Sequence, residues 1–252
     1  MVDFSLKGKV ALITGASRGI GESIAVTLAE YGAHCILVSR KLDALESVAE
    51  KIRGNGGTAD ALACHMGFLE QIDALYKEVE ERWGKLDILV NNAATNPYFG
   101  GLEGVDESIW DKTLSVNLKG PFFMSQKAVP LMVKSGGGSI VNVSSVNGIR
   151  PAFFQGVYSI TKAALITMTQ SFAKELGSKN IRVNALLPGL TETKFSQALI
   201  GNEMIHTEVV KQIPLGRHAQ PDEMAGAVLY LVSDTASFTT GTCITCDGGF
   251  LT

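Results

Sequence analysis

The sequence predicts an α/β fold: one domain with a doubly wound parallel sheet of about seven strands and helices on both faces. Short apolar runs rich in β-branched residues alternate with longer segments of helical period, which is the pattern of βαβ units. The 252 residues are 46% hydrophobic and 19% charged, with 27 glycines, and this composition suits a large core with many tight turns. Because no internal repeat, linker or low-complexity tract is visible, we expect residues 1–252 to form one domain.

The predicted elements follow from hydrophobic periodicity and from the turn residues that bound each run. The strands are expected at 9–14, 34–39, 58–64, 86–91, 138–144, 181–187 and 242–246. The helices are expected at 20–31, 42–53, 70–83, 106–134, 158–176 and 221–233.

One long segment, residues 190–217, breaks this alternation. It follows a strand that ends in "LLPG", and its apolar residues are loosely spaced among polar ones. Long excursions of this kind are usually functional, and connections after strand C-terminal ends border the ligand crevice of a doubly wound sheet. We predict a lid over a substrate, with a plain surface helix as the alternative.

Charge and composition exclude several classes of function. The net charge of -3, with Lys and Arg scattered, leaves no basic footprint for nucleic acid and no polybasic run for a membrane surface. No apolar run reaches about 18 residues, and no signal peptide is visible, so we expect a cytoplasmic protein. The four cysteines (Cys35, Cys64, Cys243 and Cys246) are expected to be structural thiols, and neither they nor the histidines have the spacing of a metal site.

The stretch "TGASRGIG" (14–21) lies between the first predicted strand and the first helix. In that position a glycine-rich turn lets a pyrophosphate approach the backbone and the helix N-terminus, which is typical of a Rossmann-like dinucleotide site. The predicted cofactor contacts in this turn are Gly15, Ser17, Arg18, Ile20 and Gly21.

The end of the second strand favours one dinucleotide over the other. An NAD site would have a carboxylate there for the ribose 2′-hydroxyl, whereas this chain has Ser39 followed by Arg40. Together with Arg18, these residues suit a 2′-phosphate, because Arg pairs bidentately with phosphate oxygens. We therefore expect NADP(H), with NAD(H) as the alternative if both arginines are merely solvated.

The stretch "YSITK" (158–162) puts a phenol and an ammonium on the first turns of an otherwise apolar helix. Residues four apart share one helix face, so Tyr158 and Lys162 are neighbours. By itself such a pair indicates only a surface contact over apolar neighbours.

Taken together, these motifs resemble the short-chain dehydrogenase/reductase family over nearly the whole chain. "TGASRGIG" is similar to its glycine turn, "NNAA" (91–94) to its motif after the fourth strand, and "PGLTET" (188–193) to its nicotinamide motif. The stretches "CHMG" (64–67) and "NAATNPYFG" (92–100) look most like NADP-dependent carbonyl and retinol reductases. The further cofactor contacts that the resemblance implies are His65, Met66, Asn91, Ala93, Tyr158, Lys162, Pro188, Gly189, Thr191 and Thr193. His65 departs from the Asp that many members have there.

The resemblance implies a catalytic set of Asn117, Ser145, Tyr158 and Lys162. The family serine precedes the tyrosine by thirteen residues, which selects Ser145, whereas Ser144 completes the strand end. Tyr158 would be the general acid/base, and the charge of Lys162 would lower the pKa of its phenol from about 10. Lys162 would also bind the nicotinamide ribose, Ser145 would stabilise the substrate oxygen, and Asn117 would hold a water that links Lys162 to solvent.

The expected substrate is a hydrophobic ketone, aldehyde or secondary alcohol, because the bulky residues around the predicted pocket are apolar. The predicted substrate contacts are Ser145, Asn147, Phe153, Phe154, Tyr158, Phe195 and Leu199. Two alternatives remain open: a 3-oxoacyl-carrier-protein reductase, and a non-catalytic dinucleotide-binding or scaffold protein. Broad apolar arcs on helices 106–134 and 157–177 predict a homotetramer or homodimer.

Overall fold

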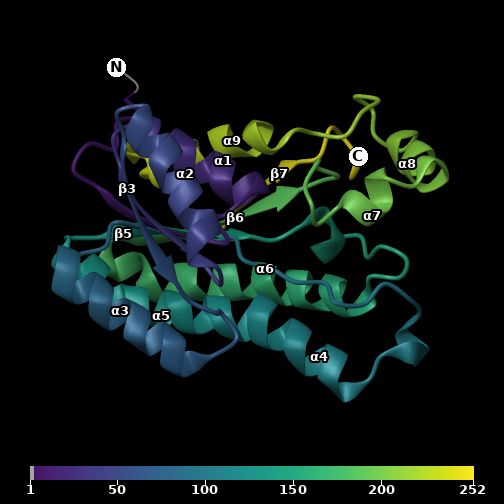
Figure 1. Ribbon diagram of the computed structural model, residues 1–252, viewed down its shortest axis with the longest axis horizontal. Helices are drawn as coiled ribbons and strands as arrows, with labels where there is room; N and C mark the ends of the chain where they lie inside the picture. Colours follow the sequence, from purple (N-terminus) through teal and green to yellow (C-terminus); the bar gives the residue numbers. More distant parts are fainter. Residues whose placement is uncertain (1–2) are drawn as a thin grey trace.

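The computed structural model describes residues 3–252 and confirms the predicted fold class (Figure 1). Seven parallel strands form one sheet in the order β3-β2-β1-β4-β5-β6-β7. The strands are β1 (Val10–Thr14), β2 (His34–Ser39), β3 (Thr58–Ala63), β4 (Ile88–Asn91), β5 (Gly138–Val143), β6 (Ile181–Pro188) and β7 (Cys243–Cys246). The strand order reverses between β1 and β4, and ligands bind at such a switch point in doubly wound sheets.

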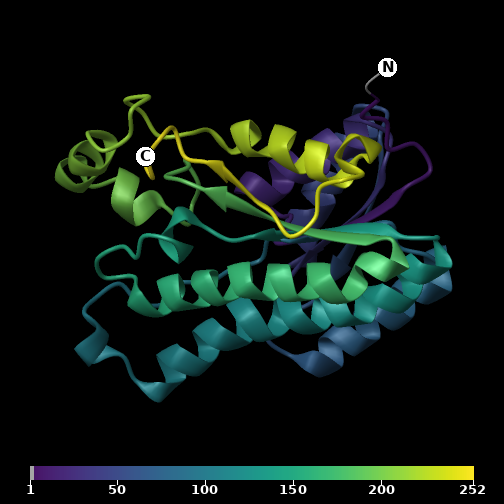
Figure 2. The same ribbon diagram turned by 180° about the vertical axis from the view of Figure 1, so that it is seen from behind.

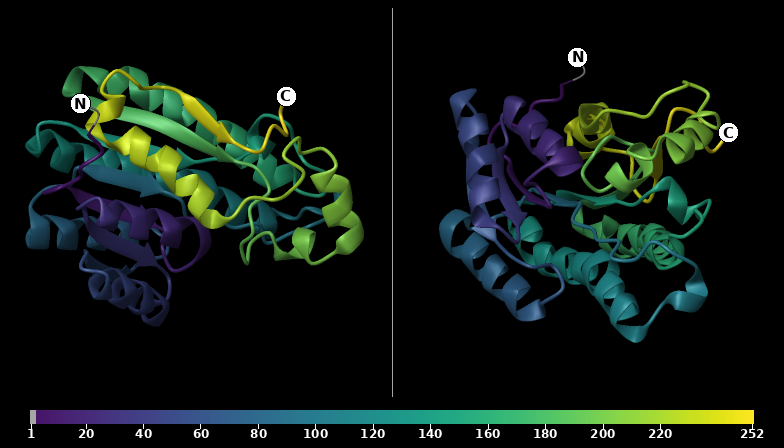
Figure 3. Two further views of the ribbon diagram at one scale, coloured as in Figure 1. Left: turned by 90° about the horizontal axis from the view of Figure 1, so that it is seen from above. Right: turned by 45° about the vertical axis from the view of Figure 1, so that its right-hand side comes forward.

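Helices cover both faces of the sheet, as Figure 2 and the right-hand view of Figure 3 show. One face packs against α1 (Gly19–Glu30), α2 (Leu42–Gly54) and α9 (Ala225–Val232). The other packs against α3 (Leu69–Trp83), α5 (Gly120–Lys134) and α6 (Gly156–Leu176). The remaining helices are α4 (Glu107–Leu114), α7 (Gln197–Ile200) and α8 (Glu203–Val210). No helix in the described part of the chain is both long and apolar enough to cross a membrane.

The strands and helices form because each buries apolar side chains against the sheet. In β1 all five residues are buried, with Leu12 in the core on one face and Ile13 in the core on the other, as strand alternation requires. In α2 the buried residues Leu45, Val48, Ala49 and Ile52 recur every three or four positions, so one stripe faces the sheet. Burial on both faces explains why the strands read as continuous apolar runs.

The predicted helix 106–134 is interrupted. It consists of α4, a π-helical turn at Ser115–Lys119, and α5. Asn117 lies inside the π turn, where its Nδ2 donates to the carbonyl of Thr95 at 2.8 Å and its Oδ1 accepts from the Thr95 N–H at 2.8 Å. Single π turns inside helices are frequent at functional sites, and this one brings Asn117 to the loop after β4.

The segment 190–217 contains two short helices, α7 and α8, at the end of the sheet near the C-terminus (Figure 3, left). Its two ends are paired: the Glu192 N–H donates to the Ala219 carbonyl at 2.8 Å, and the Ala219 N–H donates to the Leu190 carbonyl at 2.9 Å. We call this segment the lid and residues 190–196 its stem.

Candidate active site

The glycine-rich turn between β1 and α1 has no room for side chains. Gly15 and Gly19 have positive φ angles of 68° and 60°, which side chains disfavour. A Cβ on Gly21 would lie 2.4 Å from Asn92 Nδ2 and 2.4 Å from the Gly15 carbonyl oxygen. The turn therefore presents bare backbone at the N-terminus of α1, which fits the pyrophosphate of a dinucleotide.

Asn92, which was not among the predicted contacts, holds this turn in place. Its Nδ2 donates to the Thr14 carbonyl at 2.9 Å and to the Gly15 carbonyl at 3.2 Å. The Thr14 hydroxyl in turn accepts from the backbone N–H groups of Asn92 and Ala93, each at 3.0 Å. The tandem asparagines after a buried strand were the only sequence signal for this role.

The side chain of Asn91 does not reach the cofactor turn. It is 2% exposed, and its Nδ2 donates to Asn142 Oδ1 at 2.9 Å and to Ser125 Oγ at 3.1 Å. This side chain is therefore a structural link between β4, β5 and α5, and the cofactor contact of Asn91 stays a prediction.

Two arginines, one in the glycine turn and one directly after β2, place positive charge at the same edge of the predicted cofactor site. Arg18 and Arg40 are exposed, and within residues 3–252 neither forms an ion pair. Burial lowers the pKa of His65, and the nearby charges of Arg40 and then Lys112 lower it further. Met66 is buried. An anion at this edge would meet several cations, which fits a ribose 2′-phosphate.

The four predicted catalytic residues come from three elements and are all buried. Tyr158 and Lys162 lie on α6, Ser145 follows β5, and Asn117 lies in the π turn. Lys162 Nζ donates to the Val143 carbonyl at 2.7 Å and lies 5.4 Å from the centroid of the Tyr158 ring. Asn117 Nδ2 also lies 3.2 Å from the Thr161 hydroxyl, which links it to α6.

The two serines after β5 have different partners. Ser144 Oγ donates to the Lys162 carbonyl at 2.8 Å, so it ties α6 to the sheet. Ser145 Oγ accepts from the Asn147 N–H at 3.1 Å, and the Ser145 side chain acts to lower the pKa of Tyr158. Ser144 is thus engaged with α6, and the assignment of Ser145 to the substrate oxygen stays a prediction.

Burial dominates the protonation of the catalytic pair. It raises the pKa of Tyr158 to about 12, although the hydrogen bond with Ser145 acts in the opposite direction. It lowers the pKa of Lys162 to about 7. The expected lowering of the phenol pKa by the lysine is therefore absent here, because desolvation disfavours both charged forms. In this state Tyr158 holds its proton.

The predicted nicotinamide motif, Pro188–Thr193, runs from the end of β6 into the lid stem. A Cβ on Gly19 would lie 3.1 Å from Thr193 Cγ2, so Thr193 lies against the glycine turn. Thr191 Oγ1 donates to the Gly189 carbonyl at 3.1 Å, and Ser196 hydrogen-bonds both Thr191 and Thr193. The stem thus contacts the predicted pyrophosphate site directly.

The predicted pocket residues are only partly brought together. The Phe195 ring packs on the Tyr158 ring with centroids 5.4 Å apart, and Leu199 is half-buried on α7. Asn147 Nδ2 donates to Oε1 of the buried Gln155 at 3.5 Å, a residue that sequence reasoning missed. Its position in a turn gave no periodic signal.

The two consecutive phenylalanines lie farther out. Phe153 is 91% exposed, so it does not line an enclosed pocket as expected. Phe154, with φ of 62°, packs on Phe99 at 5.7 Å, and its carbonyl accepts from the Gly100 N–H at 3.1 Å. The strained Phe154 therefore joins the two loops that border the site.

Comparisons with known proteins agree on one family. The family model described as "Enoyl-(Acyl carrier protein) reductase" matches residues 15–251. Human "Dehydrogenase/reductase SDR family member 4" is 39% identical over 244 residues, covering 97% of this chain and 88% of the relative. The 3-oxoacyl-(acyl-carrier-protein) reductase FabG of Thermotoga maritima is 40% identical over 246 residues, covering 98% of this chain and 99% of the relative.

Solved structures share the whole fold. A gluconate 5-dehydrogenase from Burkholderia cenocepacia, in complex with NADP and tartrate, superimposes with a TM-score of 0.94 at 33% identity, covering 98% of this chain and 97% of that one. A 3-oxoacyl (acyl-carrier-protein) reductase from Agrobacterium tumefaciens with NADP bound gives 0.91 at 36% identity, covering 98% and 95%.

Proposed function

The chain belongs to the short-chain dehydrogenase/reductase family, and on this premise we propose that it is an NADP-dependent oxidoreductase that interconverts hydrophobic ketones or aldehydes with alcohols. The observation that carries this proposal is the buried set of Ser145, Tyr158 and Lys162 beside a glycine turn without room for side chains. A non-catalytic binding protein would have no use for two ionisable groups at this depth, because burying them costs stability.

The proposed chemistry divides between the cofactor and the protein. When bound, NADPH supplies the hydride for the carbonyl carbon. Tyr158, which holds its proton because burial raises its pKa to about 12, donates that proton to the developing alkoxide. Ser145 would hydrogen-bond the same oxygen, and Lys162, which donates to the Val143 carbonyl, would hold the nicotinamide ribose when the cofactor is bound. The side-chain amide of Asn117 is already bonded to Thr95, so we assign any water relay to its main chain.

NADP is the proposed cofactor because the two exposed arginines have no carboxylate partner in the described chain. Arg18 comes from the glycine turn and Arg40 from the end of β2, and no acidic residue occupies the strand end. The two structural relatives named above are described with NADP bound. NAD remains the alternative that the cofactor tests below must exclude.

A hydrophobic substrate is favoured by the side chains above Tyr158. Phe195 packs on the tyrosine ring, and Phe99 and Phe154 pair at the site border. Arg150, the arginine near these loops in the described chain, packs over the Phe250 ring at 5.1 Å and donates to Gln212 at 3.3 Å. Since Arg150 is engaged, it offers no ready clamp for the carboxylate of a sugar acid such as gluconate.

A protein-bound acyl substrate is the second candidate, since one relative is a 3-oxoacyl-(acyl-carrier-protein) reductase. Such a reductase needs free cations at the mouth of the site to dock an acidic carrier. Around the lid, Arg217 is paired with Glu223 and Lys211 with Glu208. Both of these cations are paired internally, and Lys194 is the further lysine of the lid. Because one cation makes a small docking patch, we favour a small-molecule substrate.

A substrate panel with NADPH and NADH tests this function. It should include aryl and alicyclic ketones, a keto sugar acid and an acetoacetyl thioester. We expect the apolar ketones to exceed the polar substrates in kcat/KM by about tenfold or more, because one buried methylene is worth about 1–3 kcal/mol. A keto sugar acid or the thioester at the head of the series would refute the proposed substrate class. Tight NADPH binding without any turnover would favour the non-catalytic alternative.

We also propose that the protein forms a homotetramer or homodimer through α5 and α6. Phe122 on α5 is 41% exposed although it packs on Phe172 of α6, and Val133 and Ile160 on the same helices are exposed as well. Exposed large apolar side chains on neighbouring helices favour burial between copies. Light scattering that gave a stable monomer of 26.8 kDa would contradict this assembly.

A further inference from the structure

Helix α8 of the lid is weakly attached to the rest of the molecule. None of its residues is buried. Within the described chain, its side chains and backbone hydrogen-bond mainly to residues 202–212, and one side-chain bond reaches beyond that segment: the contact between His206 and His218. Its apolar residues Ile205, Val209 and Val210 are only half-buried, and a helix with so little buried apolar surface opens at low free-energy cost, so this bond influences its position.

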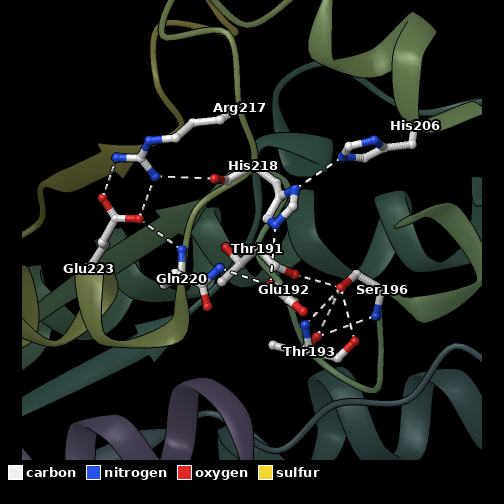
Figure 4. A network of polar contacts seen from close by, with 9 residues as sticks. All are labelled: Thr191, Glu192, Thr193, Ser196, His206, Arg217, His218, Gln220 and Glu223. Carbon is white, nitrogen blue, oxygen red and sulfur yellow. Dashed lines mark hydrogen bonds and ion pairs between the residues drawn. The ribbon is translucent and has the colours of Figure 1, made fainter. Parts of the chain in front are cut away.

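The bond belongs to a chain of three titratable side chains (Figure 4). His206 Nε2 lies 3.0 Å from His218 Nδ1, and His218 Nε2 lies 3.3 Å from a carboxylate oxygen of Glu192. Gln220 Nε2 donates to the same oxygen of Glu192 at 2.8 Å. Hydrogen bonds from Gln220 and then His218 lower the pKa of Glu192, so its carboxylate stays ionised. Because an ionised carboxylate only accepts hydrogen bonds, His218 must donate to it.

The residues around Glu192, at the end of the hydrogen-bonded series away from α8, are held by several further hydrogen bonds. Arg217 forms two bonds of 2.7 Å to Glu223, and the Glu223 carboxylate also accepts from the Gln220 N–H at 2.8 Å. Glu192 is held by the backbone pairing with Ala219. The mobile partner is therefore His206 on α8.

The lid stem connects the hydrogen-bonded series of His206, His218 and Glu192 both to the glycine turn and to Tyr158. Thr193 lies against Gly19 of the glycine turn, and Phe195 packs on Tyr158. Ser196, buried in the stem turn, hydrogen-bonds Thr191 and Thr193 and leads directly into α7. A shift of α8 would therefore be transmitted through α7 to Phe195.

The His206–His218 bond has room for one hydrogen between the two facing nitrogens. With His218 Nε2–H directed at Glu192, the His218 Nδ1 lone pair accepts from His206 Nε2–H while His218 is neutral. If both rings become imidazolium, both facing nitrogens carry hydrogens, the bond is lost, and two positive charges face each other with ring centroids 5.2 Å apart.

The neighbouring charges cannot fully compensate for that repulsion. Glu192 offsets one of the two positive charges, and Arg217 with Glu223 and Lys211 with Glu208 are already paired. The other charged residues of these elements are Glu203 at the start of α8 and Lys194 in the stem, both exposed. Two positive charges on the facing rings would therefore be only partly offset.

We propose that His206, His218 and Glu192 form a proton-controlled latch that holds α8 and so positions Phe195 over the catalytic tyrosine. All three are positioning residues, since none of them contacts the proposed reacting atoms. The functional consequence of the latch rests on the proposed reductase activity, whereas the latch itself does not.

Hydrogen exchange in the free protein tests the latch without cofactor or substrate. The amides of 203–210 are compared at about pH 8 and about pH 5, corrected for the intrinsic pH dependence, with α9 as an internal reference. We expect the protection of α8 to fall about fivefold at the lower pH while that of α9 stays constant, because one hydrogen bond is worth about 1 kcal/mol. Equal protection of α8 at both pH values would overturn the proposal.

The matched variant is His206→Gln. A glutamine amide can donate to, or accept from, His218 in either protonation state, so it keeps the bond but removes one titrating ring. We expect α8 of this variant to show constant protection across the same pH range. His34→Gln, at the opposite edge of the sheet, should behave like the wild type. A pH-dependent α8 in His206→Gln would show that these rings are not the switch.

A kinetic comparison separates the latch from the proposed function. In the wild type the KM for an apolar ketone should rise about tenfold toward the lower pH relative to its value in His206→Gln, with kcat changing equally in both. A protein with the expected exchange but no turnover would retain the latch and lose the proposed function. Turnover with identical KM profiles in the two proteins would overturn the coupling of the latch to Phe195.

Discussion

The catalytic floor and the lid differ in how the chain holds them. On the floor, Tyr158 and Lys162 are 8% and 2% exposed, and α6 is tied to the sheet by the bond from Ser144. In the lid, α8 buries no residue and depends on a histidine pair. The packing of the floor suits groups that must be held in fixed positions, whereas the weak attachment of α8 suits a segment that opens for substrates, the role proposed for the lid. The two regions should therefore respond differently to substitution.

The largest effect is expected on the floor, from Tyr158→Phe. This change removes the transferable proton and keeps the ring that packs on Phe195. Because general acid catalysis is worth about 10²–10⁴-fold, kcat should fall by that factor while NADPH titration by fluorescence shows unchanged binding. Near-normal turnover would mean that another group supplies the proton, which would contradict the role of Tyr158 as the general acid.

The next effect concerns the glycine turn. In Gly21→Ala the new Cβ would lie 2.4 Å from both Asn92 Nδ2 and the Gly15 carbonyl oxygen, so the turn must shift. We expect the Kd for NADPH to rise about a hundredfold, because misplaced backbone N–H groups lose several charge-assisted bonds. Gly226→Ala in α9 is the matched control, since no atom lies within 4 Å of its Cβ. Equal affinities in the two variants would show that the turn does not bind the pyrophosphate.

A substitution of Arg40 tests the choice between NADPH and NADH. Arg40→Asp should repel a 2′-phosphate and accept a ribose hydroxyl, which moves the ratio of kcat/KM for NADPH over NADH toward NADH by about tenfold or more. The measurement is the pair of kcat/KM values in each protein. A wild type that already prefers NADH would contradict the cofactor assignment.

A smaller effect, on stability, compares a floor lysine with a lid lysine. Burial lowers the pKa of Lys162 from 10.5 to about 7. Between these values the unfolded chain binds a proton that the folded protein releases, so the free energy of unfolding should rise with pH across this range. Urea unfolding of the free protein at about pH 7 and about pH 9.5 should show a rise of about 1 kcal/mol or more that is absent in Lys162→Met. Lys194 is exposed, so Lys194→Met should keep the wild-type increase in the free energy of unfolding with pH. The same increase in Lys162→Met would contradict the lowered pKa of Lys162 as its cause.

The features that the sequence predicted well are those that depend on local sequence and on burial on both faces of the sheet. The strands were readable because helices cover both faces of the sheet, so each strand is a nearly continuous apolar run. The proposed catalytic residues Ser145, Tyr158 and Lys162 could be named from the sequence because the family motifs that they resemble are short local stretches. The glycine turn was found for the same reason.

The features that sequence reasoning missed depend on contacts between distant segments. Asn92 holds the glycine turn across 77 positions of sequence, and the π turn at Asn117 reflects bonds to Thr95 and Thr161. The bond between His206 and His218 joins a helix to a loop with no periodic pattern. The raised pKa of Tyr158 also could not be read from spacing, because it comes from burial.

Transfer of deuterium from cofactor to substrate tests the proposed reductase most directly. The protein is mixed with NADPH that carries deuterium at both C4 positions of the nicotinamide and with an apolar aryl ketone, and the product alcohol is analysed by mass spectrometry. We expect deuterium on the carbinol carbon with the wild type and, at equal cofactor occupancy, about 10²–10⁴-fold less product per unit time with Tyr158→Phe. The absence of labelled alcohol from a wild-type protein saturated with NADPH would contradict the proposed reduction of apolar ketones.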